Sequence, residues 1–123
     1  MRSKSGFTLV EMIIVITLIA LILSITLPNY INTIEKNKEV VLKQNLSALR
    51  LSIDQYYSDN GNYPEDLQIL IEKKYIRSIP VDPTTESNSW EIIYYNDDQN
   101  MGIYDVKSKS LIESSQGNLY SQW

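Results

Sequence analysis

The stretch KSGFTLVEMIIVITLIALILSITLP, residues 4–28, decides the fold of this chain, because residues 12–34 carry no charge at all. A helix needs about 20 apolar residues to cross a lipid bilayer, and the apolar residues on either side of Glu11 bring the segment to that length. Arg2 and Lys4 precede it, and basic residues favour the cytoplasmic side of a membrane. The sequence therefore predicts a single-pass membrane helix with a short cytoplasmic N-terminus and an outward C-terminal domain.

The segment fits less well as a secretory signal or as a buried core helix. A cleaved secretory signal has an apolar stretch of about 7–15 residues and a small-x-small cleavage site behind it, and the longer run here ends without such a site. A buried core helix would need a large domain around it, and the remainder of the chain is too short to supply one.

Glu11 is the one carboxylate inside the apolar segment, where a charge costs about 2.5–3.5 kcal/mol on insertion scales. Either it lies close enough to the membrane interface to reach water, or it meets a positive charge inside an assembly. If the chain were cut after Gly6, Phe7 would carry a free amine one helical turn before Glu11, within reach of its carboxylate.

The composition excludes several classes of function. The chain has 123 residues, one domain's worth of material, with no cysteine and no histidine, so thiolate and imidazole metal sites, disulfides and histidine-dependent nucleophiles are absent. Its formal net charge of −4 argues against binding nucleic acid through phosphates. The glycines are scattered singly, and acidic pairs that are sequence neighbours are no sign of acid–base catalysis. We therefore expect a protein that is not an enzyme.

Residues 4–11, KSGFTLVE, resemble the leader motif of type IV pilins and type II secretion pseudopilins. The resemblance implies that a membrane prepilin peptidase cuts the bond between Gly6 and Phe7 and methylates the new amine of Phe7. It also implies that Glu11 pairs with the N-terminal amine of a neighbouring subunit during assembly. Pro28 stands where the family often carries a kink in its long helix.

A helical pattern resumes after Pro28, although proline removes one hydrogen bond and bends a helix. Apolar residues recur at steps of three and four and predict an amphipathic helix, with charged side chains, among them Glu39, on its other faces. The sequence Asn60-Gly61 predicts its end, because glycine accepts the left-handed conformation there. The apolar stripe consists of Ile31, Ile34, Val41, Leu42, Leu46, Leu49, Ile53 and Tyr56.

The remaining residues predict a small α+β part. Residues 63–67 are typical of a helix start, with Pro64 in the first turn. Residues 90–95 and 101–106 are rich in aromatic and β-branched side chains, and the polar residues 96–100 between them favour a β-hairpin. At the C-terminal end we expect the tail to be fixed by Leu119, Tyr120 and Trp123.

The predicted fold is thus α+β and pilin-like, with a long N-terminal helix packed on a small domain that holds a short helix and an antiparallel hairpin. The predicted organisation is a leader at 1–6, a transmembrane and assembly helix at 7–28, the amphipathic half of the helix at 29–60, and a globular part at 61–123.

Two later stretches, DNGNYP at 59–64 and YIRSIPVDP at 75–83, resemble the major pseudopilins of type II secretion. Many of these end in a calcium loop of the type GPDG…DD, which this sequence does not reproduce. Calcium prefers six to eight oxygen ligands; Asp105 with Glu113 offers too few nearby carboxylates, and Asp97 and Asp98 could supply two. No cofactor is expected, and these two aspartates are the candidates for a calcium site.

The resemblance implies a structural subunit of a pseudopilus at the inner membrane, with a cytoplasmic N-terminus and a periplasmic domain. Its implied partners are copies of itself in a helical filament, the prepilin peptidase, the assembly platform with its ATPase, and minor pseudopilins. Two alternatives stay open: a type IV pilin of a surface fibre, and a monomeric membrane-tethered binding module. Glu11 distinguishes the last of these, because a tether gains nothing from a buried carboxylate.

Overall fold

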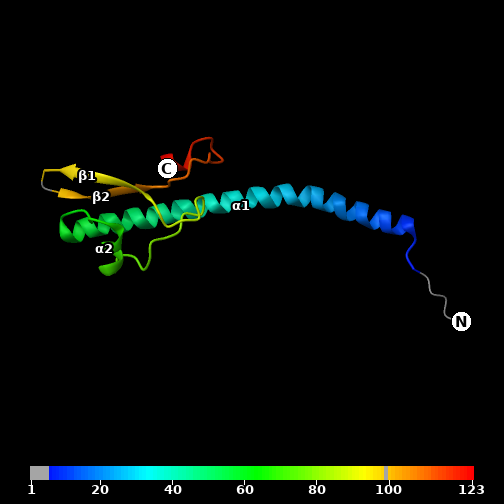
Figure 1. The fold of residues 1–123 in the computed structure, drawn as a ribbon, viewed down its shortest axis with the longest axis horizontal. Coiled ribbons are helices and arrows are strands. Elements are labelled where there is room, and N and C mark those ends of the chain that lie inside the picture. The colour runs from blue at the N-terminus through cyan, green and yellow to red at the C-terminus, as the bar shows by residue number, and fades with distance from the viewer. Residues whose placement is uncertain (1–5, 99) are drawn as a thin grey trace. The chain divides into compact units, whose positions relative to one another are not determined.

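The protein is described by a computed structural model that covers residues 6–98 and 100–123. The leader residues 1–5 and Gln99 of the predicted turn lie outside this range. The chain divides into two compact units, Met1–Glu35 and Lys36–Trp123. Its elements confirm the predicted α+β class (Figure 1): they are α1 (Leu9–Asn60), α2 (Leu67–Glu72), β1 (Glu91–Asp97), β2 (Asn100–Lys107) and the 3-10 helix η1 (Tyr120–Gln122).

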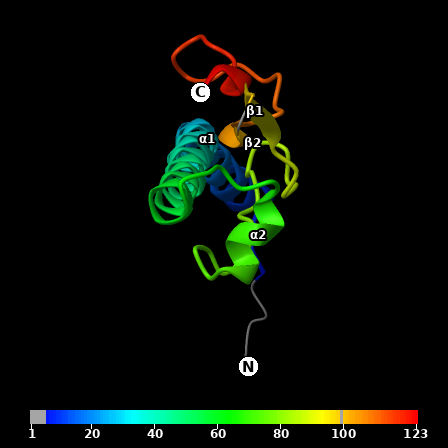
Figure 2. The ribbon, with the colours of Figure 1, turned by 90° about the vertical axis from the view of Figure 1, so that its left-hand side faces the viewer.

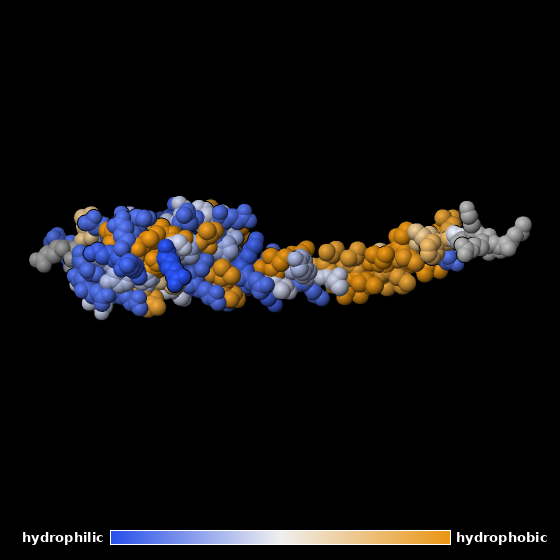
Figure 3. All heavy atoms as spheres, turned by 90° about the horizontal axis from the view of Figure 1, so that it is seen from below, coloured by the Kyte–Doolittle hydropathy of each residue, from blue (hydrophilic) through white to orange (hydrophobic). Residues whose placement is uncertain are grey.

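The first unit is an exposed apolar helix. α1 continues without interruption through Pro28, as the resumed periodicity predicted. Every residue from 6 to 35 is exposed, and the hydrophobic colour dominates this segment in Figure 3. α1 is the one helix in the described residues that is long and apolar enough to cross a membrane, and none of its most apolar window is buried.

In the second unit, α1 contributes one face to the core. Leu42, Leu46, Leu49 and Ile53 follow one another at steps of four, three and four residues and are all buried, so they lie on one side of the helix. Side chains from α2, β2 and η1, with Trp90 just before β1, complete this core, which also contains Tyr56, Leu67, Leu70, Trp90, Ile103, Val106 and Tyr120. Figure 2 shows the hairpin and α2 at different positions around α1.

The predicted stripe was too long. Ile31, Ile34 and Val41 are exposed. Ile31 and Ile34 precede Glu39, the first residue of α1 that other segments of this unit cover. Val41 lies next to Leu42 in sequence, about 100° away around the helix, and therefore outside the buried face.

The predicted hairpin is confirmed. β1 and β2 pair antiparallel from Glu91 opposite Lys107 to Asp97 opposite Asn100, with an irregularity in register between Ile93 and Tyr94. The strands extend further than predicted and take up part of the polar stretch 96–100, because backbone pairing continues to the last residues before the turn.

The start of α2 differs from the prediction. Asp66 is its N-cap and accepts a hydrogen bond from the Ile69 N–H at 2.8 Å, so the helix begins at Leu67. Pro64 lies before the cap rather than in the first turn. Its carbonyl accepts a hydrogen bond from the Ile103 N–H at 2.7 Å, which joins the turn after α1 to β2.

Gly102 makes this junction sterically feasible. A Cβ atom on Gly102 would lie 2.6 Å from both the Cβ and the carbonyl oxygen of Tyr63. Two segments far apart in sequence therefore approach more closely here than any residue other than glycine allows.

Glu39 holds the C-terminal segment against α1. Its side chain is only 9% exposed, contrary to its predicted place on a polar face. The carboxylate accepts hydrogen bonds from the N–H of Ser115 at 2.6 Å, from the Ser115 hydroxyl at 2.7 Å and from the Tyr120 hydroxyl at 2.9 Å. These donors compensate the burial of the charge.

Arg50 makes a second connection further along α1. Its guanidinium pairs with Asp105 at 2.8 Å and donates to the carbonyl oxygens of Val106 and Trp123. Tyr120 is buried and Trp123 packs against the core, which confirms that these two aromatic residues fix the tail.

The stability of this unit should depend on the charge of Glu39. The Ser115 N–H is the main cause that lowers the pKa of Glu39 from its ordinary value of 4.5, although burial acts in the opposite direction. Because the pKa is lower in the folded state, the contribution is present above 4.5 and is lost as the pH falls through the folded pKa. We expect acidification from pH 7 to pH 3 to lower the free energy of unfolding more in the native chain than in Glu39→Gln. Urea unfolding of residues 29–123 at several pH values measures this difference, and parallel pH profiles would contradict it.

Candidate processing and assembly site

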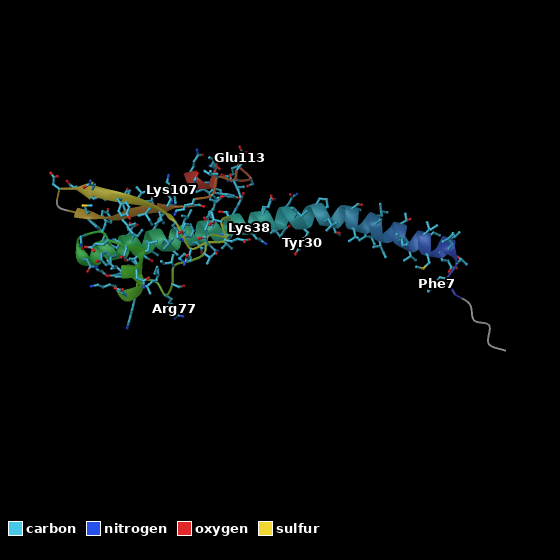
Figure 4. The ribbon with its side chains drawn as sticks, viewed as in Figure 1. Phe7, Tyr30, Lys38, Arg77, Lys107 and Glu113 are labelled. Atoms are coloured by element: carbon cyan, nitrogen blue, oxygen red, sulfur yellow. The ribbon has the colours of Figure 1, made fainter. Side chains whose placement is uncertain are left out.

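The bond between Gly6 and Phe7 lies in an exposed, non-helical segment. Residues 6–8 precede α1, which begins at Leu9. Phe7 is 81% exposed, and a Cβ placed on Gly6 would meet no heavy atom within 4 Å. Figure 4 shows Phe7 at the beginning of the helix. A peptidase can therefore bind this bond without first unwinding a helix.

Thr8 and Glu11 form a reciprocal capping box at the start of α1. The Thr8 N–H donates to Oε2 of Glu11 and the Glu11 N–H donates to the hydroxyl of Thr8, each at 3.2 Å. Both bonds satisfy backbone donors that have no partner inside the helix. This arrangement was not predicted, although the pattern Thr-x-x-Glu before an apolar run is its usual signal.

The capping box fixes where the carboxylate lies. Glu11 is in the first turn of α1, where the positive end of the helix dipole stabilises a negative charge. One of its oxygens bonds to Thr8, and Oε1 has no hydrogen bond in the described part of the chain. That second oxygen is available to an ammonium group.

The other candidate residues do not join this site. Pro28 lies inside α1. Asp97 and Asp98 lie at the hairpin turn and are exposed, and Asp97 accepts a hydrogen bond from the Asp98 N–H at 2.8 Å. Among residues 6–98 and 100–123, no three His, Cys, Asp or Glu side chains gather closely enough to hold a metal ion.

Comparison with known proteins places the N-terminal segment in a recognised family. Residues 1–27 match the family described as "Prokaryotic N-terminal methylation motif". The chain is 32% identical over 98 residues to the type II secretion system core protein G of Klebsiella michiganensis, covering 67% of this chain and 69% of the relative. The protein of the same name from Klebsiella pneumoniae is 32% identical over 99 residues, covering 68% and 71%. No solved structure matches.

An apolar α1 behind an N-terminal methylation motif, followed by a short helix and an antiparallel hairpin, defines a pilin-like protein. This class consists of structural subunits and not of enzymes. Within it, the chain belongs to the family of type II secretion system core protein G, as the resemblance of its motifs predicted. Among the described residues, α1 is the one helix long and apolar enough to cross a membrane, which is consistent with a single membrane anchor.

Proposed function

We propose that this chain is the repeating subunit of a pseudopilus that is assembled from the inner membrane for type II protein secretion. The observation that carries the proposal is the fully exposed apolar surface of α1 before Glu35. A surface of this size needs either lipid or other apolar helices around it. The membrane covers it in the free subunit, and copies of the same helix cover it in the fibre.

The assembly follows from how identical subunits associate. Each copy presents the same helix to a neighbour, and a repeated contact between different faces extends as a filament when its rotation does not close a ring. We assign residues 7–28 to the membrane and to helix packing, and residues 29–60 and 61–123 to the part outside the membrane. Pro28 has no backbone N–H to donate to the preceding turn. The missing hydrogen bond would let α1 bend at this point when the subunit moves from lipid into the array.

Processing prepares the subunit for this array. A prepilin peptidase hydrolyses the amide between Gly6 and Phe7, which leaves a carboxylate on the removed leader and an ammonium on Phe7. A methyl group from a methyl donor then replaces one N–H hydrogen, and the charge is kept. The processed chain would then meet the inner-membrane platform with its ATPase and the minor pseudopilins, while its C-terminal domain lies in the periplasm.

Intact-mass analysis of the membrane fraction tests the processing step. We expect a chain that lacks residues 1–6 and carries one additional methyl group on Phe7. Gly6→Leu is the matched control: nothing lies within 4 Å of a Cβ at this position, so the fold should be unaffected and only recognition by the peptidase should be lost. A native chain that keeps its leader in a host with the peptidase would contradict the assignment.

Removal of the gene from its host tests the function. We expect secreted proteins to accumulate in the periplasm, and the native gene to restore their export. Sheared fibres that contain the processed chain should appear when it is overproduced. Normal export together with loss of a long surface fibre would instead favour a type IV pilus.

A further inference from the structure

The charges of the unit Lys36–Trp123 separate along α1. Residues 36–50 contain Lys36, Lys38, Lys43 and Arg50, and their one acidic residue, Glu39, is buried and hydrogen-bonded. By contrast, residues 51–66 and 91–98 contain acidic residues and no lysine or arginine. These turns of α1 are therefore basic, whereas the end of α1, the turn after it and β1 are acidic. Outside these segments, the exposed Glu113 lies toward the first end, and Lys73 and Lys74 adjoin Tyr75, which bonds to Asp59 at the second end.

These two regions lie at opposite ends of the unit. Residues 36 and 60 are separated along α1 by about 36 Å at 1.5 Å per residue. Strands β1 and β2 lie beside the far end of α1 (Figure 1), and the rings of Tyr63, just after α1, and Tyr95 in β1 are 5.4 Å apart. Segment 108–119 lies at the near end, because Ser115 bonds to Glu39.

At each end, two exposed apolar side chains lie near the charged residues: Tyr94 and Met101 at the far end, and Leu111 and Ile112 at the near end. At the far end, the distal patch consists of Tyr94, Asp97, Asp98 and Met101, all exposed, with Met101 72% exposed. At the near end, the basal patch consists of Lys36, Lys38, Lys109, Leu111 and Ile112, all exposed, with Leu111 79% exposed.

Neither patch has an ionic partner among residues 6–98 and 100–123. Arg50 with Asp105 is the sole ion pair between described residues, so the lysines of the basal patch and the aspartates of the distal patch are all unpaired. The distal patch also contains a groove of about 290 Å³, lined by Glu65, Tyr94, Met101 and Gly102. A single aliphatic side chain from another molecule fits a hollow of this kind.

We propose that the distal patch of one copy docks onto the basal patch of a second copy, with Leu111 entering the groove and Lys36 and Lys38 facing Asp97 and Asp98. This inference rests on the proposed function, because parallel helices in a filament bring the far end of one domain toward the near end of another. The apolar contact supplies affinity, and the opposite charges set the register and exclude reversed pairings. An anionic membrane surface would satisfy the lysines alone and leave the acidic distal patch without a partner.

Charge exchange in the full-length chain tests the proposal. We expect Lys36→Glu with Lys38→Glu, and separately Asp97→Lys with Asp98→Lys, each to lower the yield of sheared fibres about five-fold while the processed subunit stays at its native level. Combining all four substitutions should restore at least half of the native yield, since opposite charges face each other again. A folding defect in either double variant could not be repaired in this way.

The matched control is Lys73→Glu with Arg77→Glu. It changes the net charge as much as the basal reversal does, and both residues are exposed and lie outside the two patches; Figure 4 shows Arg77. This control should assemble normally. The proposal is overturned if both reversals assemble normally, if only the basal reversal matters, or if the combination stays defective. A native chain that forms no fibre at all would refute the proposed function, and the docking contact with it.

Discussion

Glu11→Gln is expected to leave cleavage after Gly6 normal and to reduce fibre assembly at least about a hundredfold. Two unit charges about 4 Å apart attract by roughly 4 kcal/mol at an effective dielectric near 20. Leaving one partner buried and unpaired costs about 3–5 kcal/mol, and about 1.4 kcal/mol corresponds to a factor of ten. In the proposed array the unpaired charge would be the ammonium group of Phe7.

The capping box makes glutamine the informative replacement. Its side-chain oxygen can still accept the Thr8 N–H that Oε2 of Glu11 accepts at 3.2 Å, since Gln serves in capping boxes as Glu does. Glu11→Gln therefore removes the charge and keeps the helix start, whereas Glu11→Ala removes both. Glu11→Asp should retain part of the function if its shorter arm reaches the amine.

Thr8→Val is the control for the cap itself. It deletes the hydroxyl that accepts from the Glu11 N–H and keeps the carboxylate, at a cost of about 1 kcal/mol to the helix start. We expect most assembly to survive in this variant. Fibre yield and processed-subunit level are measured together. Normal assembly of Glu11→Gln would mean that the carboxylate serves only the cap.

Gly102→Ala is expected to lower the free energy of unfolding of residues 29–123 by about 3 kcal/mol, the upper end of the usual cost of overpacking. The new methyl group would lie 2.6 Å from the carbonyl oxygen of Tyr63, and a backbone atom cannot move aside as a flexible side chain can. Relief of the clash would stretch the 2.7 Å hydrogen bond from the Ile103 N–H to Pro64.

Urea unfolding of residues 29–123 measures this loss, and we expect the native fragment to unfold cooperatively as an α+β monomer. Gly61→Ala is the matched control. Gly61 has a φ of +75° and no heavy atom within 4 Å of a Cβ, so alanine adds only backbone strain of about 1 kcal/mol. Equal losses in the two variants would mean that close packing at Gly102 is unimportant.

Local signals in the sequence were sufficient for most elements. The apolar run, the Asn60-Gly61 stop and the two aromatic runs each depend on neighbours within a few residues, and all three predicted the structure. The cap of α1 was equally local. It was missed because the carboxylate of Glu11 was considered only as a charge in the membrane and not as a hydrogen-bond acceptor.

Other errors came from contacts between distant residues. Glu39 has the composition of a solvent-exposed helical position, and its burial depends on Ser115, 76 residues further on. The close approach at Gly102, for which the sequence made no prediction, likewise depends on Tyr63 in the turn after α1. The hydrophobic periodicity of a segment does not predict such contacts, because they depend on which distant segment packs against it in the folded domain. The same holds for the N-terminal limit of the apolar stripe, because Ile31 and Ile34 lie before the part of α1 that the returning segment covers.

The distance in sequence between these partners has a consequence for biosynthesis. A ribosome releases α1 first, yet Glu39 bonds to residues 76 and 81 positions later, and Arg50 bonds to Trp123, 73 positions later. A chain is synthesised from its N-terminus, so α1 is complete before the segments that pack on it. Apolar surface that stays exposed during this time is prone to aggregation. Until Ser115 and Tyr120 have been translated, Glu39 and the adjoining turn of α1 stay uncovered. A chain interrupted before that point would carry its membrane helix without a finished domain, and would be a natural substrate for chaperones or proteases at the membrane.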